Sequence, residues 1–115
     1  MKRKIELIEV PIACTLDRRA FEGRMNEFDA LFRDALIDRE RTANGIRFRF
    51  ANGDGVESRI RDLAARELEC CSFFEFTISR AAGEVWWEAS VGDSDARPVL
   101  DEFFALPERL AEARS

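Results

Sequence analysis

A carboxylate precedes two adjacent thiols in the segment Glu67-Leu68-Glu69-Cys70-Cys71-Ser72-Phe73-Phe74-Glu75-Phe76. Residues three and four apart share one face of a helix, so Glu67 would lie beside both cysteines. A helix over residues 56–71 is predicted by apolar residues at helical spacing, which are Val56, Ile60, Leu63 and Ala64. Glu67 falls near the middle of that apolar stripe. A carboxylate on a buried face is costly unless it is paired or bound, so we predict a partner for it.

Three thiols and one carboxylate are enough for a closed four-ligand metal site. Thiolates select soft ions such as zinc or copper(I), and mercury(II) and arsenite are thiophilic as well. Zinc sites normally use Cys-x2–4-Cys spacing, but an adjacent pair can turn both sulfurs to one ion where a helix ends. We therefore expect a soft metal or metalloid at Cys14, Cys70 and Cys71, with Glu67 as the fourth ligand or in the second coordination sphere.

Two other interpretations of the thiols stay open. A nucleophilic or redox cysteine is usually activated by a helix N-terminus or a nearby cation. Cys70 and Cys71 lie instead at a helix C-terminus, the negative end of the dipole, among several glutamates. This favours a sensor, buffer or carrier over an enzyme, and we assign no catalytic residue. Alternatively, the cysteines are structural, Glu67 pairs with an arginine, and the protein is an interaction or dimerisation module.

Composition narrows the class of protein. The 115 residues predict one globular domain over 1–115, with 46% hydrophobic and 36% charged residues. The net charge of −5 argues against a nucleic-acid partner. No segment is long and apolar enough to predict a membrane span, and the acidic residues after the basic start do not fit a signal peptide. We therefore expect a cytoplasmic protein with reduced thiols. Histidine is absent, which removes Cys-His pairs and imidazole ligands.

Hydrophobic periodicity predicts the elements that position these residues. Residues 4–16 are predicted to form a strand with Cys14 on its apolar face, interrupted by Pro11. A helix follows from Asp17 to about 35 or 36, with Arg24 among the residues of its polar side. Asn44-Gly45 predicts a type I′ hairpin of residues 38–43 and 46–50, with Glu40 opposite Arg49. Residues 37–43 could instead continue the helix.

The second half predicts a helix, a hairpin and a final helix. After the helix of residues 56–71, alternating residues 74–79 and 85–91 flank a turn at 81–84. The final helix begins at a cap provided by Ser94 or Asp95, and Pro107 breaks or kinks it. The fold class is therefore α+β. It has two layers: a mostly antiparallel sheet of four to five strands and about three helices on one face. The order also contains a hairpin-plus-helix unit twice, without a repeat at the level of residues.

Two surface features could bind other molecules. Trp86 is out of phase with Val85 and Trp87, so it is expected to face away from the core, on a homodimer surface or a small-ligand pocket. Four arginines of the first predicted hairpin could bind an anion or form a salt-bridged face: Arg39, Arg41, Arg47 and Arg49.

The cysteine segments also resemble a known family. Cys14-Thr15-Leu16 and Glu67-x-x-Cys70-Cys71-x-Phe73-Phe74-x-Phe76 are similar to a family of small bacterial proteins that is common in actinobacteria. Members resemble this chain over nearly its whole length and occur alone or beside regulators of the mercury-resistance type. This sequence has Ser72 where the family pattern has proline. The resemblance implies a role in the heavy-metal response, with the three cysteines as ligands and a regulatory protein as partner.

Overall fold

The computed structural model describes residues 18–114, except for the side chains of Arg18, Cys70 and Arg114. Its elements in chain order are α2 (Arg18–Ala35), β1 (Leu36–Arg41), β2 (Gly45–Ala51), α3 (Val56–Cys70), β3 (Phe74–Ala81), β4 (Glu84–Val91), the short 3-10 helix η1 (Ser94–Ala96) and α4 (Arg97–Arg114). The predicted strand over 4–16, with Cys14 and Pro11, lies outside the described residues.

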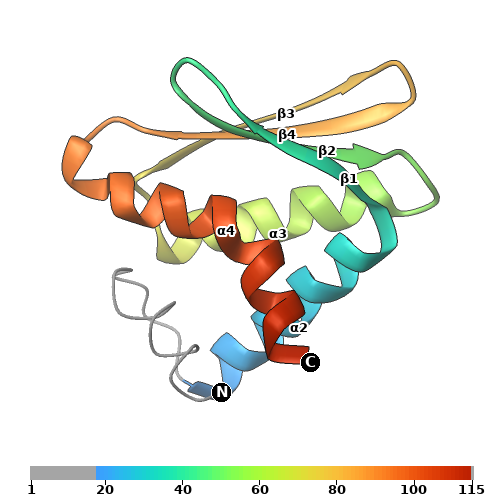
Figure 1. Ribbon diagram of the computed structural model, residues 1–115, viewed down its shortest axis with the longest axis horizontal. Coiled ribbons are helices and arrows are strands. Elements are labelled where there is room, and N and C mark those ends of the chain that lie inside the picture. The colour runs from blue at the N-terminus through green and yellow to red at the C-terminus, as the bar shows by residue number, and fades with distance from the viewer. Residues whose placement is uncertain (1–17, 115) are drawn as a thin grey trace.

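The predicted α+β fold is confirmed. The four described strands form one antiparallel sheet in the order β1-β2-β4-β3. Figure 1 shows the three helices gathered below one face of this sheet, while its other face is left open. The central strands β2 and β4 therefore alternate between apolar residues toward the helices and more polar residues toward the open face. In β4, for example, Val85, Trp87 and Ala89 are buried and the residues between them are not. In the edge strand β1 the residues on the helix side are Arg39 and Arg41, whose strand partners Phe48 and Ile46 are buried.

Both long predicted helices form as their apolar spacing indicated. In α3 the predicted stripe is buried, with Val56, Ile60, Leu63 and Ala64 each at most 6% exposed. In α2 the buried apolar residues are Phe21, Phe28, Leu31, Phe32 and Ala35. One prediction for α2 is wrong, because Arg24 is buried rather than on the polar side.

The first hairpin differs from its predicted form in turn and register. Residues 36–41 are a strand, which decides between the two alternatives for this segment. Glu40 pairs with Arg47 rather than Arg49, because the connection is longer than a two-residue turn. Neither Asn44 nor Gly45 has the positive φ of a type I′ turn. Glycine serves another purpose here: a Cβ at Gly45 would lie 2.0 Å from the carbonyl oxygen of Ala89, so only glycine lets β2 approach β4 this closely.

The second hairpin uses the tight turn instead. Ala82 and Gly83 have φ values of 53° and 76°, the left-handed conformation that a two-residue hairpin connection requires. Ser94 and Asp95, the predicted caps, lie within η1, whose N-cap is Asp93: the Asp93 carboxylate accepts from the backbone N–H of Asp95. Pro107 lies inside α4, which continues to Arg114 along a bent course (Figure 1).

The two hairpin-plus-helix units are related by a shift of 39 residues. Adding 39 to the pair Arg39↔Phe48 gives Ile78↔Trp87, and the other regular pairs of the first hairpin follow the same rule. Phe48 and Trp87 pair with each other across the two central strands. An approximate twofold axis therefore passes between them. The predicted hairpin-plus-helix repeat is thus visible in the pairing of the strands, which is the same in both hairpins.

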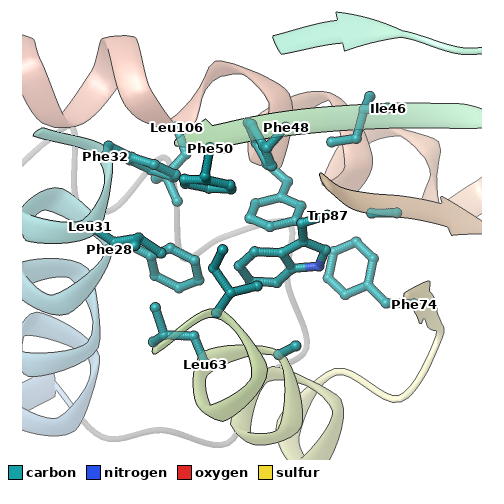
Figure 2. Close-up of a cluster of buried hydrophobic side chains, with 14 of the residues drawn as sticks. Phe28, Leu31, Phe32, Ile46, Phe48, Phe50, Leu63, Phe74, Trp87 and Leu106 are labelled. Carbon is teal, nitrogen blue, oxygen red and sulfur yellow. The ribbon is translucent and has the colours of Figure 1, made fainter. Parts of the chain in front are cut away.

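The core lies between the sheet and the helices and is rich in aromatic rings (Figure 2). Trp87 is fully buried at its centre, with ring centroids 6.0 Å from Phe28 of α2 and 5.4 Å from Phe103 of α4. Phe74 and Phe76 of β3 extend the same cluster. These contacts position α2, which carries Arg24, and the buried stripe of α3, which carries Glu67, packs into the same core through Ile60 and Leu63.

Candidate functional site

The predicted partner of Glu67 is Arg24. The Arg24 Nη1 donates a hydrogen bond of 2.8 Å to the Glu67 Oε2, and the two side chains are only 9% and 14% exposed. The bond joins the face of α3 that packs into the core to the corresponding face of α2. A charged hydrogen bond of this kind compensates part of the cost of burying both ions.

Arg24 could have been found from the sequence by its spacing. It lies three residues after Phe21 and four before Phe28, both of which are buried in α2. These intervals place it on the apolar stripe, whereas its residue type suggested the polar side. A buried arginine and a buried glutamate on neighbouring helices are each other's natural counter-ions, and neither position alone shows which residue it meets.

Burial dominates the electrostatics of the Glu67 carboxyl. Its pKa is raised by burial, and the charge and hydrogen bond of Arg24, with the charge of Arg66, oppose that rise. Arg66 itself is bound to Glu27 of α2 and to Asp62 of its own helix. The hydrogen bond from Arg66 lowers the pKa of Glu27. The α2–α3 contact thus contains an exposed group of ion pairs around Arg66 and a buried pair, Arg24–Glu67.

Cys71 follows directly at the end of α3. Its backbone N–H donates to the Glu67 carbonyl oxygen at 2.7 Å, and its φ of −134° turns the chain out of the helix. The residue is 1% exposed. Cys71 is also in a disulfide bond, which differs from the expectation of reduced thiols. Of the other predicted ligands, Cys14 lies outside the described residues and the side chain of Cys70 is not described.

The arrangement brings Glu67, Arg24 and Cys71 to the C-terminal turn of α3. In the part of the chain that the structure describes, no group of three or more His, Cys, Asp or Glu side chains is close enough to hold a metal ion. That part contains the side chain of only one of the three predicted thiol ligands, Cys71. One oxygen of the Glu67 carboxylate, Oε2, is engaged by Arg24.

The 39-residue repeat shows what the fold itself requires at these positions. Ile60, Ala64 and Cys71 correspond to Val99, Phe103 and Leu110, all of which are buried. By the same shift Glu67 corresponds to Leu106, which is 4% exposed. The second unit therefore fills the position of Glu67 with a leucine. The correspondence does not hold throughout the helices, because the buried Val56 and Leu63 correspond to the exposed Asp95 and the partly exposed Glu102.

The open face of the sheet is a network of ion pairs. Arg47 contacts Glu40 and Glu88, while Arg49 contacts Glu84. Arg39 and Arg41 pair with acidic residues of α4. All four arginines are therefore salt-bridged, but they do not form one face as expected, because the strand partners of Arg39 and Arg41 are the buried Phe48 and Ile46 on the helix side. A hollow of about 440 Å³ lies on the open face, and neither Glu67 nor Cys71 lines it.

Trp86 lies on the open face, as predicted. The Arg47 guanidinium lies 4.5 Å from the centre of its ring, and its Nε1 donates to Glu84 at 2.8 Å. The ring is half-buried by these neighbours.

The raised pKa of Glu67 predicts how stability depends on pH. The folded protein takes up this proton at a higher pH than the unfolded chain, whose carboxyl has the ordinary pKa of 4.5. Stability from this group therefore rises as pH falls through the folded pKa toward 4.5. In urea unfolding of oxidised, metal-free protein, the wild type should gain stability relative to Glu67→Gln between about pH 7 and that value. An unchanged difference would contradict the raised pKa.

Glu84 supplies a control of opposite sign. Hydrogen bonds from Arg49 and Trp86 lower the pKa of its carboxyl to about 2. Its contribution to stability is present above the unfolded pKa of 4.5 and is lost as pH falls toward 2. The wild type should therefore lose stability relative to Glu84→Gln over that range.

No described helix has the length and apolar character needed to cross a membrane. Comparison with family models, with curated proteins and with solved structures found no significant match to this chain.

Proposed function

We propose that the reduced protein binds a thiophilic metal or metalloid ion through Cys71 together with Cys14 and Cys70, and acts as a sensor, buffer or carrier of that ion. The disulfide of Cys71 is the observation that carries this proposal. A disulfide holds two sulfurs about 2.05 Å apart. Sulfurs that bind one ion at about 2.3 Å lie within roughly 4 Å of each other. After reduction, the two sulfurs of the former disulfide need to move apart by only about 2 Å to bind one ion.

The surroundings of Cys71 support a buried, electrically balanced site. The charges of Glu67 and Arg24 cancel in an ion pair at the last turn of α3, which Cys71 follows. Thiolates added there would carry unbalanced negative charge, which a bound cation or metalloid removes. In this proposal Glu67 acts in the second coordination sphere, because its carboxylate already accepts a hydrogen bond from Arg24.

Titration of reduced protein tests the proposal. The protein is reduced with a phosphine, desalted under argon, and titrated calorimetrically with zinc, mercuric ion or arsenite. We expect saturable binding of at least one of them, and loss of roughly a hundredfold or more in affinity on Cys71→Ser, as for removal of one of few ligands. The oxidised protein is the matched control and should not bind. Binding equal to that of a triple Cys→Ser variant would exclude the thiol site.

A second candidate is an interaction module in which the cysteines are structural. Arg24 and the disulfide account for Glu67 and Cys71 without any ion, and the open sheet face carries the half-buried ring of Trp86. A homodimer through this face would show concentration-dependent sedimentation that Trp86→Ala abolishes. A wild-type monomer at all concentrations removes this candidate.

A further inference from the structure

The open face of the sheet carries more negative than positive charge. Residues that pair across neighbouring strands share a face, as do residues two apart along one strand. Starting from Trp86, these two rules assign two arginines to the open face, Arg47 and Arg49, and five acidic residues, which are Asp38, Glu40, Glu75, Glu84 and Glu88. The described strands therefore present an excess of three negative charges on this face.

The two arginines do not cancel this charge, because each is shared between two carboxylates. Arg47 contacts Glu40 of β1 at 2.9 Å and Glu88 of β4 at 2.6 Å. Arg49 lies in the same way between a carboxylate of β1, at 3.7 Å, and Glu84 of β4, at 2.9 Å. Each of these groups of three side chains keeps one negative charge.

Glu75 carries the third charge, at the hollow of the open face. Within the part of the chain that the structure describes, Glu75 makes no ion pair, and the Ser90 Oγ lies 3.5 Å from its Oε1, too far for a strong hydrogen bond. The hollow, of about 440 Å³, is lined by Glu75, Glu88 and the hydroxyl-bearing residues Thr77 and Ser90, among others. Carboxylate and hydroxyl oxygens accept hydrogen bonds from ammonium and guanidinium groups. The hollow thus offers acceptors and an uncompensated charge to a cation.

The carboxylates are spaced like the side chains of an extended chain. Every second residue of a strand points to the same side, roughly 6.6 Å apart. Asp38 and Glu40 are two residues apart on β1, and Glu84 and Glu88 are four apart on β4. We propose that the open face docks a cationic segment of another protein. Lysine or arginine side chains on one side of this extended segment meet the carboxylates, and one of them enters the hollow beside Glu75.

A second copy of this chain fits the open face less well than a basic partner. It would bring the same excess of negative charge, and like charges placed against each other oppose association. The docking needs neither a thiol nor a metal ion, so it is tested on oxidised, metal-free protein and stands or falls separately from the thiol site.

Fluorescence anisotropy with a labelled peptide tests this surface. The probe is a peptide in which lysine alternates with threonine, and its control has glutamine in place of lysine. An ionic strength of about 0.1 M screens charges more than about 10 Å away, so local contacts dominate. We expect saturable binding of the lysine peptide, weakened roughly fivefold or more by Glu75→Gln/Glu88→Gln. Thr77→Lys keeps both carboxylates but places a cation of the protein's own in the hollow, and it should weaken binding as well.

Glu22→Gln/Glu69→Gln is the matched control, because it removes two charges from exposed positions on α2 and α3, which lie on the other side of the sheet (Figure 1). It should change the affinity less than about twofold. Equal losses in the two double variants would reveal a general attraction to an acidic protein and overturn the proposal. Equal binding of the two peptides, or binding of neither, would overturn it too. So would a concentration-dependent dimer that Glu75→Gln/Glu88→Gln strengthens, since a second copy would then cover this face.

Discussion

Replacing Arg24 by methionine alone should destabilise the folded protein by roughly 3–5 kcal/mol, because the Glu67 carboxylate would stay buried without its counter-ion. The reverse change, Glu67→Leu alone, should cost a similar amount because it strands the guanidinium. The double variant Arg24→Met/Glu67→Leu removes both charges and should lie within about 1 kcal/mol of the wild type. Urea unfolding of the oxidised proteins, followed by circular dichroism, gives the three values.

The structural repeat makes the double variant the informative member of this cycle. Leu106, which occupies the corresponding position of α4, is buried as leucine should be at residue 67 once Arg24 is apolar as well. A double variant as unstable as the sum of the two single variants would mean that the pair is a packing requirement of the fold. The interpretation of Glu67 as a functional residue would then lose its main structural support.

Trp87→Ala should cost roughly 3–5 kcal/mol in the free energy of unfolding, because it leaves a cavity at the centre of the core. The ring is fully buried and contacts aromatic side chains from two helices and two strands. Trp87→Phe should cost much less, less than about 1.5 kcal/mol. The Trp87 Nε1 is buried and finds no acceptor among the described groups, so removing it offsets part of the lost packing.

Trp86→Phe is the matched control, because it makes the same change one residue away on the open face. Its effect on stability should be below about 1 kcal/mol, since only a partly exposed hydrogen bond and a cation–π contact change. If Trp87→Phe were as damaging as Trp87→Ala, the buried Nε1 would have to be satisfied in solution.

Local patterns were sufficient to predict most of this fold. The spacing of Val56, Ile60 and Leu63 predicts α3 because one face of an isolated helix must be covered by something apolar. The alternation in residues 74–79 and 85–91 predicts the second hairpin for the same reason. Turns were less predictable, since Asn44-Gly45 suits a type I′ turn but the chain uses Gly45 for a close approach to β4. That approach depends on Ala89, which lies 44 residues further along the chain, and leaves no local signal.

In the candidate site, too, local patterns predict some features and tertiary packing decides the others. That Glu67 needs a partner follows from its place on a buried stripe, which is local information. That the partner is Arg24 depends on how α2 packs on α3. Arginine normally favours the exposed side of a helix. The residue type of Arg24 therefore led to its assignment to the polar side, although its spacing from Phe21 and Phe28 placed it on the apolar stripe. The disulfide of Cys71 is likewise not specified by the spacing of cysteines in one sequence.

X-ray absorption at the arsenic edge, on reduced protein loaded with one equivalent of arsenite, tests the central claim most directly because it reports the atoms bound to arsenic. We expect three sulfur neighbours, from Cys14, Cys70 and Cys71, in place of the oxygens of free arsenite. Arsenic surrounded by oxygen alone, as in free arsenite, would contradict the thiol site at the end of α3.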